Sequence, residues 1–293
     1  MSSSLLLRLL GVVLVAALAV RAEFSEDFRQ FLIRRYGRTK MAELERLDMG
    51  GMRMGSFGGR ESPNERRANR PVVMIHGTTL RAGIFNQHRD FFMQNGYQPG
   101  ELFATTYSDG GLSPLFAKKM ECRDVQQVRD MIKAVAEYSN STVDVLGYSM
   151  GVAMTRKAIL GGRCVDTLEE LGEPLTHLVD TYVGVGGVAW GYESCVVNER
   201  TWPACNPING MVWRSKFLLD VNAPPQKYEG KTVYAIYTTT DQVVGQQCNG
   251  KQCSSIKNAD LVIAKSGFDH VSVLFLTKEL QFSLFKYHIS GGL

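Results

Sequence analysis

The stretch TVDVLGYSMGVAMTRKAIL, residues 142–160, decides the fold of this chain. Residues 142–146 form a mainly apolar run that is typical of a strand covered on both faces. Residues 150–160 favour a helix that ends at two glycines. Between them, Gly147-Tyr148-Ser149-Met150-Gly151 matches Gly-x-Ser-x-Gly, a sharp turn that lifts a serine hydroxyl above the sheet and points a helix N-terminus at it. The sequence therefore predicts Ser149 as a nucleophile.

The segments on either side of this turn alternate between strands and helices. Short apolar runs predict strands, and apolar residues at helical spacing predict helices. The predicted strands are 72–75, 103–107, 178–183, 232–237 and 260–264, and the predicted helices are 124–138 and 271–287. This alternation predicts an α/β fold with a mostly parallel central sheet between helices. With the serine turn it indicates an α/β-hydrolase domain, which we place at residues 71–293 with an insertion at about 188–230.

In this fold the general base follows the serine in the chain. Three histidines do so. His270 occupies a short loop between a predicted strand and the last helix, where its ring would project over the serine, so we predict it as general base and acid. His177 precedes a strand and is expected at the surface or strand edge. His288 ends the last helix, a common place for a cation.

The acid that orients the histidine is predicted to be Asp241. It follows the strand 232–237 and a run of threonines, and it lies between the serine and the histidine in the chain, as this fold requires. Asp269 is the rival, but adjacent residues on a tight loop seldom present their side chains to each other. Asp220 and Asp260 directly follow no predicted strand.

A second motif, His76-Gly77-Thr78-Thr79, follows the strand 72–75. Acyl transfer through an oxyanion needs two well-placed donors. We predict the backbone N–H groups of Thr78 and Met150 for this role. The glycine of the motif allows a close approach of the main chain. Its histidine precedes the serine and is expected to orient the loop rather than to act as the base.

These motifs resemble those of the class 2 lipases, and specifically those of the secreted nematode lipase-like proteins of that family. The matching segments cover most of the chain after residue 55 and are 56–59, 71–83, 104–107, 147–151, 156–162 and 183–187, with Asp241 and His270. The resemblance implies a compact α/β-hydrolase that cleaves carboxylic esters and has its triad and oxyanion donors at the five positions named above. The family often has histidine where this chain has Tyr148, which alters the local hydrogen bonding.

We therefore expect a secreted serine hydrolase that cleaves ester bonds of lipids through an acyl-enzyme, first of all a triacylglycerol lipase. A carboxylesterase or acyltransferase acting on smaller esters is an alternative, and so is a non-catalytic lipid-binding protein of the same fold. The insertion either forms a lid or acyl-binding wall that faces lipid, or packs its aromatic side chains inward as core. These side chains are Trp190, Tyr192, Trp202, Trp213 and Phe217.

The first 22 residues are predicted to be a signal peptide. The apolar run 9–20 is shorter than the ~20 residues of a membrane-spanning helix, and Val20-Arg21-Ala22 offers small residues ahead of a cleavage site. Cleavage after Ala19 and an uncleaved anchor are the alternatives. Residues 23–70 are expected to form an N-terminal extension with one or two amphipathic helices interrupted near Gly37. Its two Arg-Arg pairs lie on the surface or mark a propeptide.

Six cysteines in an exported chain predict disulfides, although the sequence leaves 15 pairings open. The pairs Cys195–Cys205 and Cys248–Cys253 close short loops, which would leave Cys122 with Cys164. Zinc is the alternative, but no Cys-x-x-Cys pair supports it. Asn140 begins an Asn-Ser-Thr sequon and is a predicted glycosylation site.

The net charge of +4 falls to +2 when Arg8 and Arg21 leave with the signal peptide, and the chain has no long basic block. Nucleic acid is therefore not an expected partner. The sequence has no metal-binding triad, phosphate-cradling loop or complete dinucleotide fingerprint, so neither a metal nor a cofactor is expected. The expected partner is a lipid or a small ester, with transient contact to a lipid surface as an option. The oligomeric state is left open.

Overall fold

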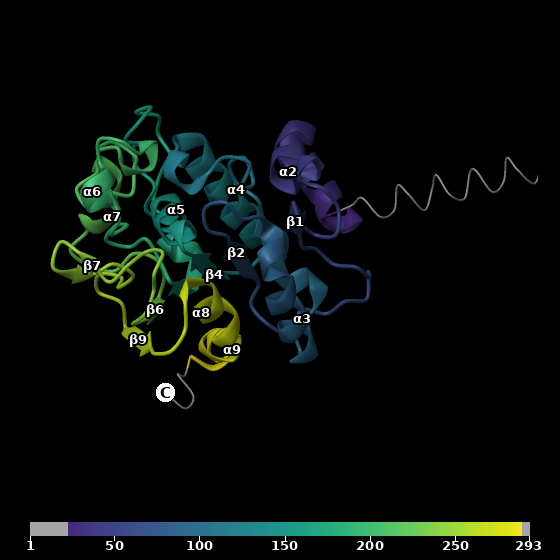
Figure 1. Cartoon of the computed structure of the whole chain (residues 1–293). Coiled ribbons are helices and arrows are strands. Elements are labelled where there is room, and N and C mark those ends of the chain that lie inside the picture. The colour runs from purple at the N-terminus through teal and green to yellow at the C-terminus, as the bar shows by residue number, and fades with distance from the viewer. Residues whose placement is uncertain (1–22, 289–293) are drawn as a thin grey trace, which may run out of the picture.

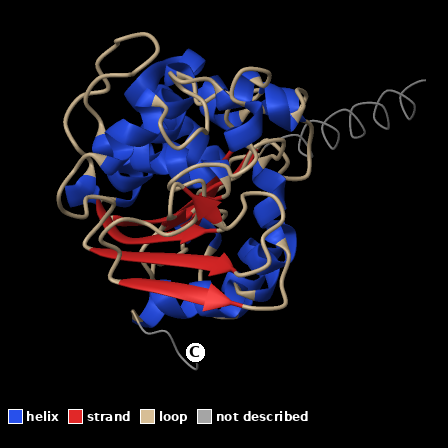
Figure 2. Ribbon diagram, turned by 60° about the vertical axis from the view of Figure 1, so that its left-hand side comes forward, coloured by secondary structure: helices blue, strands red, loops and turns tan. Residues whose placement is uncertain are grey.

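The computed structural model describes residues 23–288, so the predicted signal peptide lies outside the described residues. A seven-stranded sheet with the order β1-β3-β2-β4-β5-β6-β9 runs through the centre, and helices cover both its faces (Figures 1 and 2). Neighbouring strands are parallel except β1 and β3. This confirms the predicted fold. The strands are β1 (Ser56–Phe57), β2 (Val72–Ile75), β3 (Leu102–Thr105), β4 (Val143–Tyr148), β5 (Val179–Val185), β6 (Thr232–Thr238) and β9 (Leu261–Lys265), and a separate hairpin contains β7 (Gln247–Cys248) and β8 (Lys251–Gln252).

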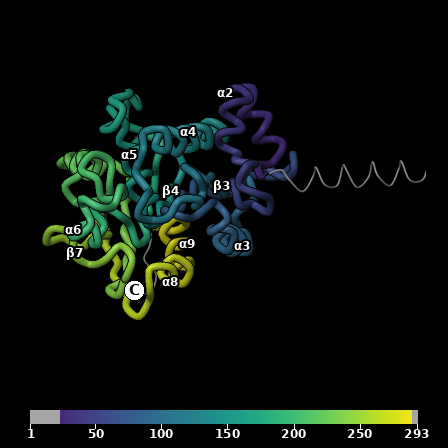
Figure 3. The backbone as a smooth tube through the Cα atoms, turned by 45° about the horizontal axis from the view of Figure 1, so that its top comes forward, coloured from purple at the N-terminus to yellow at the C-terminus, as the bar shows by residue number. Residues whose placement is uncertain are grey.

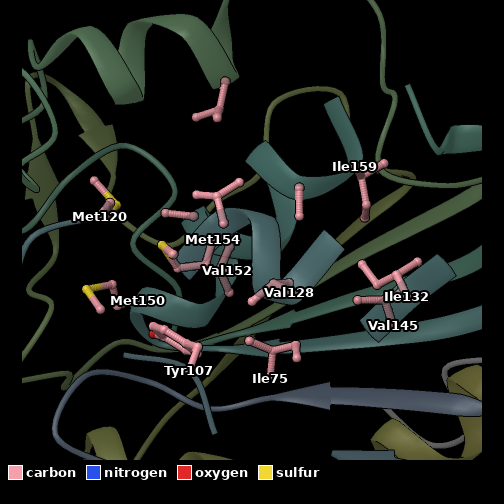
Figure 4. Close-up of a cluster of buried hydrophobic side chains, with 14 of the residues drawn as sticks. Ile75, Tyr107, Met120, Val128, Ile132, Val145, Met150, Val152, Met154 and Ile159 are labelled. Carbon is pink, nitrogen blue, oxygen red and sulfur yellow. The ribbon is translucent and has the colours of Figure 1, made fainter. Parts of the chain in front are cut away.

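The helices pack on the sheet because successive side chains of each strand point to opposite faces. In β2, Val73 and Ile75 join one core cluster, and Val72 and Met74 join the other. Figure 4 shows the first cluster, where Ile75 and Val145 of the sheet face helical side chains. The helices on this face are α2 (Glu26–Glu45), α4 (Cys122–Ser139) and α5 (Met150–Leu160), and those on the other are α3 (Asn86–Gln94), α8 (His270–Leu276) and α9 (Lys278–Tyr287).

The remaining helical elements are short. Two α-helices lie in the insertion, and single 3₁₀ turns join other elements. They are α6 (Cys195–Asn198), α7 (Lys216–Asn222) and the turns η1 (Leu47–Met49), η2 (Ala82–Phe85), η3 (Pro99–Glu101), η4 (Leu115–Ala117), η5 (Thr176–Leu178) and η6 (Pro203–Cys205).

Two details differ from the sequence prediction. The expected last helix is divided into α8 and α9 at Thr277, whose hydroxyl donates to the carbonyl of Val273 and whose backbone leaves the helical region (φ −104°, ψ 13°). The strand β1 and the helix α3 were not anticipated. A two-residue strand is too short to show periodicity, and the apolar residues of α3 are few.

The segment 23–70 packs closely on the sheet. Helix α2 is interrupted at Gly37 (φ 88°, ψ 164°), as its sequence predicts. The ring of Phe28 lies 5.1 Å from that of Phe103 and 4.8 Å from that of Tyr138, measured between centroids. Figure 3 shows α2 beside α4 at one end of the molecule, with α6 and β7 at the other. The region expected as an extension thus contributes a helix and the edge strand β1.

The three disulfides join the pairs that the spacing favoured, Cys122–Cys164, Cys195–Cys205 and Cys248–Cys253. The first ties the start of α4 to the segment after α5, the second closes a loop of the insertion, and the third closes the β7–β8 hairpin. Within residues 23–288, the one side-chain group with metal-ligand spacing is Cys122, Cys164 and Asp166, and its two sulfurs are bonded to each other. No helix in the described part of the chain has the length and apolarity of a membrane span.

Candidate active site

The turn between β4 and α5 holds Ser149 in a conformation that L-residues rarely adopt (φ 56°, ψ −126°). Contacts explain the glycines around it. A Cβ on Gly147 would lie 2.8 Å from Oγ1 of Thr155, and one on Gly151 would lie 2.4 Å from the carbonyl oxygen of His76. Only glycine lets strand and helix approach this closely, and the close approach leaves the serine at the tip of the turn.

The ring of His270 lies between the other two residues of the predicted triad. Its Nε2 is 3.1 Å from Oγ of Ser149, and its Nδ1 is 2.7 Å from Oδ2 of Asp241. All three residues are buried. His270 begins α8, directly after a residue that caps this helix, so the helix start fixes where the ring points. The structure therefore brings the three predicted residues together.

The carboxylate of Asp241 is held by the backbone of its own loop. Oδ1 accepts hydrogen bonds from the N–H groups of Val243 and Val244, each 2.9 Å long, which leaves Oδ2 for the histidine. With Nδ1 of His270 donating to this oxygen, Nε2 carries a lone pair that faces the serine. This tautomer is the one that can accept a proton from Ser149.

The rival acids have other partners. Asp269 caps α8, and its Oδ1 accepts the N–H of Ser272 at 2.6 Å. Asp220 and Asp260 form ion pairs with lysines. His288, a histidine also considered, ends α9, where its Nδ1 contacts a threonine hydroxyl of β5.

The predicted oxyanion donors lie on both sides of the serine. A Cβ on Gly77 would be 2.6 Å from Cβ of Ser149, so the loop that carries Thr78 runs directly against the nucleophile. Met150 is the first residue of α5, and its N–H therefore has no acceptor within the helix. Across residues 23–288, the N–H groups of Thr78 and Met150 donate to no other group. They line a cavity of about 10 Å³, enough for one water molecule.

His76 fixes this loop, as expected. Its ring nitrogens contact the carbonyl of Gly77 at 2.6 Å and the backbone N–H of Tyr107 at 3.1 Å. The ring also stacks on that of Tyr107, with centroids 4.4 Å apart. Complete burial lowers the pKa of His76 to about 4, so the ring is neutral at pH 7.

Two residues that the sequence did not single out for this purpose hold the backbone of His270. Oη of Tyr148 donates to the carbonyl oxygen of His270 at 2.9 Å, and the backbone N–H of His270 donates to Oε1 of Gln242 at 3.1 Å. A Cβ on Gly186 would lie 3.3 Å from Nδ1, so glycine at that position keeps space for the ring. The sequence showed that Tyr148 replaces the histidine common in the family, but it did not show the hydrogen bond from Tyr148 to His270.

The insertion supports the loop of Asp241. The N–H of Glu193 donates to the carbonyl of Val244 at 2.9 Å, and Oε2 of Glu193 accepts the N–H of Gln246 at 2.6 Å. A buried ion pair, Arg156–Glu229 at 2.8 Å, joins α5 to the chain ahead of β6. These contacts couple the insertion to both the serine helix and the acid loop.

The side chains of the insertion divide between core and surface. Tyr192 and Phe217 are buried, and Trp213 is at the border of exposure. The outer face of the insertion carries aliphatic side chains instead, with Val197 81% exposed and Val196 63% exposed. Of the five aromatic residues considered for the insertion, two thus lie in the core, and Trp190 and Trp202 pack against it while partly exposed.

The fold and the three-residue geometry define an α/β-hydrolase. The family model described as Lipase (class 2) matches residues 69–283. The chain belongs to the class 2 lipase family, whose members act on esters. A comparison with curated protein sequences found no match.

Solved structures of similar fold are lipases with low sequence identity. Aspergillus fumigatus lipase B has a TM-score of 0.56 at 15% identity over 80% of this chain and 56% of its own. The mature Bacillus licheniformis lipase BlEst2 has a TM-score of 0.53 at 15% identity over 78% of this chain and 96% of its own. A soluble variant of Saccharomyces cerevisiae monoglyceride lipase has a TM-score of 0.51 at 14% identity over 80% and 90%. At this identity the likeness concerns the fold.

Proposed function

We propose that this protein is a secreted triacylglycerol lipase with Ser149, His270 and Asp241 as its catalytic triad. The observation that carries the proposal is the continuous line of contacts from Oγ of Ser149 through the His270 ring to Asp241, in a chain of the class 2 lipase family. Family membership supplies the reaction on esters. The geometry supports the triad because a hydroxyl, an imidazole and a carboxylate lie in succession within hydrogen-bonding distance.

In the proposed reaction, Oγ of Ser149 attacks the ester carbonyl while Nε2 of His270 takes its proton. Asp241 stabilises the charged ring, and the N–H groups of Thr78 and Met150 bind the oxyanion. His270 then returns the proton to the leaving alcohol. Water, activated by the same ring, cleaves the acyl-enzyme and frees the acid and the serine.

A lipid surface is the proposed partner because apolar side chains gather beside the site. The segment 107–121 lines the cavity at Thr78 and carries the exposed Leu112 and Phe116. The ring of Phe116 lies 6.2 Å from that of Trp202 in the insertion, whose outer face is aliphatic. We propose that these two segments separate at a lipid surface, since an exposed apolar patch favours such contact.

An esterase that takes small substrates is the second candidate, favoured by one observation. The cavity lined by Thr78 and Met150, the proposed oxyanion donors, has a volume of about 10 Å³, far less than a long acyl chain needs. Triacylglycerol hydrolysis therefore requires movement around the site, and hydrolysis of a short ester requires less.

Secretion is part of the proposal. The predicted signal peptide, the three disulfides and the exposed position of Asn140 at the end of α4 support it. Asn140 remains a predicted glycosylation site.

The test is hydrolysis of acyl esters of increasing chain length, below and above the solubility limit of each ester. A lipase shows a jump in rate above the limit, and an esterase shows none. Ser149→Ala is expected to abolish turnover and to remove labelling by a fluorophosphonate probe, while Ser254→Ala, at another buried serine, leaves both unchanged. Unchanged turnover in Ser149→Ala would refute the assignment of the nucleophile. No labelling of the native protein would contradict the proposal and favour a lipid-binding protein.

A further inference from the structure

Two buried glutamates lie close together at the start of the described chain. Glu23 precedes α2, and Glu45 is its last residue. Glu23 is 5% exposed and Glu45 is fully buried. Both carboxyl oxygens of Glu23 and Oε1 of Glu45 have no hydrogen-bond partner of normal geometry within residues 23–288. Two carboxylates in one buried place repel each other and lose hydration, so this pair requires compensation.

The neighbouring cations do not balance these acids. Nε of Arg29 donates to Oε2 of Glu45 at 3.1 Å, but Nη1 of the same guanidinium pairs with Glu26 at 2.9 Å. Arg53 attracts the Glu23 carboxylate electrostatically, but its side chain is exposed to solvent. Burial raises the pKa of Glu23 to about 7 and also raises the pKa of Glu45. Among residues 23–288, no fully buried positive charge therefore accompanies the two acids.

The backbone nitrogen of Glu23 lies beside these acids, in the place where a positive charge would balance them. The backbone N–H groups of Glu23 and Phe24 lie near the Glu45 carboxylate, although neither makes a hydrogen bond of normal geometry to it. The N–H of Ser25 donates to the carbonyl of Gly58 at 2.9 Å, which fixes the start of the chain on the sheet edge. On the other side, a Cβ on Gly55 would lie 2.2 Å from a backbone oxygen at the end of α2, so the loop before β1 presses on this site.

Residue 23 is also the first residue after the predicted cleavage site. A peptidase that hydrolyses the bond between Ala22 and Glu23 adds water across it. The Ala22 carbonyl carbon gains the hydroxyl, the Glu23 nitrogen gains the proton, and the new amine takes up a further proton at neutral pH. A neutral amide nitrogen thereby becomes an ammonium group beside the Glu45 carboxylate.

We propose that the α-ammonium group of Glu23, formed by cleavage after Ala22, binds the buried carboxylates of Glu23 and Glu45. Processing thus adds a positive charge to the N-terminal region of the fold and completes an ion pair there. The inference depends on the predicted signal peptide and not on the proposed reaction.

The pair has a defined pH dependence. A carboxylate partner raises the pKa of an α-amino group above its ordinary range of about 7.7–8.0. The stability from the pair is then complete below that range and is lost as the pH rises through the raised value. The charged groups facing the amine are Glu23, Glu45, Arg29, Arg53 and, through Arg29, Glu26.

The test compares two disulfide-bonded forms of the protein. One begins at Glu23, and the other has Gly-Ser ahead of Glu23, which keeps a neutral amide at this nitrogen. Each is made with Glu45 and with Glu45→Gln, and thermal unfolding is measured at pH 7. The form that begins at Glu23 should melt roughly 2–6 °C higher, and Glu45→Gln should remove this difference. Glu43→Gln, at an exposed position of the same helix, should preserve it.

Equal melting temperatures of the two forms, or a difference that persists in Glu45→Gln, would overturn the proposal. A second measurement is independent of that variant. Limited acetylation at pH 7 should modify the α-amine of the Glu23 form several-fold more slowly than that of the Gly-Ser form, and equal rates would count against an ion pair. The mass of the secreted protein should show a chain that begins at Glu23. A chain that begins at Val20 would place the amine three residues away and refute the inference.

Discussion

Tyr148 donates a hydrogen bond of 2.9 Å from its buried hydroxyl to the backbone carbonyl of His270, and the two rings lie 5.2 Å apart between centroids at 25°. The residue ahead of the nucleophile therefore holds the residue proposed to deprotonate it. Because the hydroxyl binds the carbonyl and not the imidazole, both ring nitrogens remain available to Ser149 and Asp241.

Tyr148→Phe should lower kcat by about 3–10-fold and leave KM nearly unchanged, because one net hydrogen bond of about 0.5–1.5 kcal/mol no longer orients the base. Steady-state kinetics with a soluble p-nitrophenyl ester measure both constants. The control is Tyr228→Phe, which removes a similar buried bond to the carbonyl of Val221 and should affect stability alone. Equal kcat losses in the two variants would mean that Tyr148 has only a structural role.

Asp241→Asn should reduce kcat by about 10³–10⁴-fold, since an amide at Oδ2 favours the tautomer whose Nε2 carries the proton and cannot accept one from the serine. The neighbouring rival supplies the control. Asp269→Asn keeps a capping side chain on α8 and should lose less than about threefold. If Asp269→Asn proves the more damaging substitution, the acid has been assigned to the wrong residue.

Acid should destabilise the protein through two buried histidines. Burial lowers the pKa values of His76 and His88 to about 4, while the unfolded chain titrates near 6.5. The unfolded state thus binds more protons between these values, and stability falls as the pH drops from about 6.5 to 4. Each residue contributes about 2–4 kcal/mol to this loss.

Urea unfolding at pH 7.0 and 4.5 tests this dependence. His88→Leu should reduce the loss of unfolding free energy between the two pH values, whatever its effect at pH 7. Burial raises the pKa of Asp144 to about 7, so this residue stabilises the fold as the pH falls. The native chain and the variant share this contribution, and the difference between them excludes it. His177→Gln, at a residue outside the core, serves as the reference. A pH dependence identical in all three proteins would rule out the buried histidine as its source.

Glu229→Ala should destabilise the fold by about 3–5 kcal/mol because it leaves Arg156 charged and unpaired in the core. The melting temperature should fall by roughly 6–20 °C. The exposed pair Arg163–Glu170 offers a matched control, and Glu170→Ala should change stability by less than about 1 kcal/mol. A small effect of Glu229→Ala would show that water reaches the Arg156 guanidinium.

The sequence by itself determined the elements whose signals are local. The strand 72–75 and the helix 150–160 agree with β2 and α5, because a continuously apolar run or a helical spacing depends on near neighbours. Ser149 was identifiable because its turn demands glycine at two fixed positions. His270 and Asp241 were predicted from their place after strands and from their order along the chain, an order that Asp269 also satisfies.

Only the tertiary structure decided which distant groups meet. It placed Asp241 rather than Asp269 beside the His270 ring, set the Tyr148 hydroxyl on a carbonyl 122 residues away, and buried Arg156 with Glu229 across 73 residues. Such contacts depend on strand register and on how helices pack over the sheet, and no local pattern encodes either. The sequence thus specifies which chemical groups are present, whereas long-range packing determines their partners and their exposure to water.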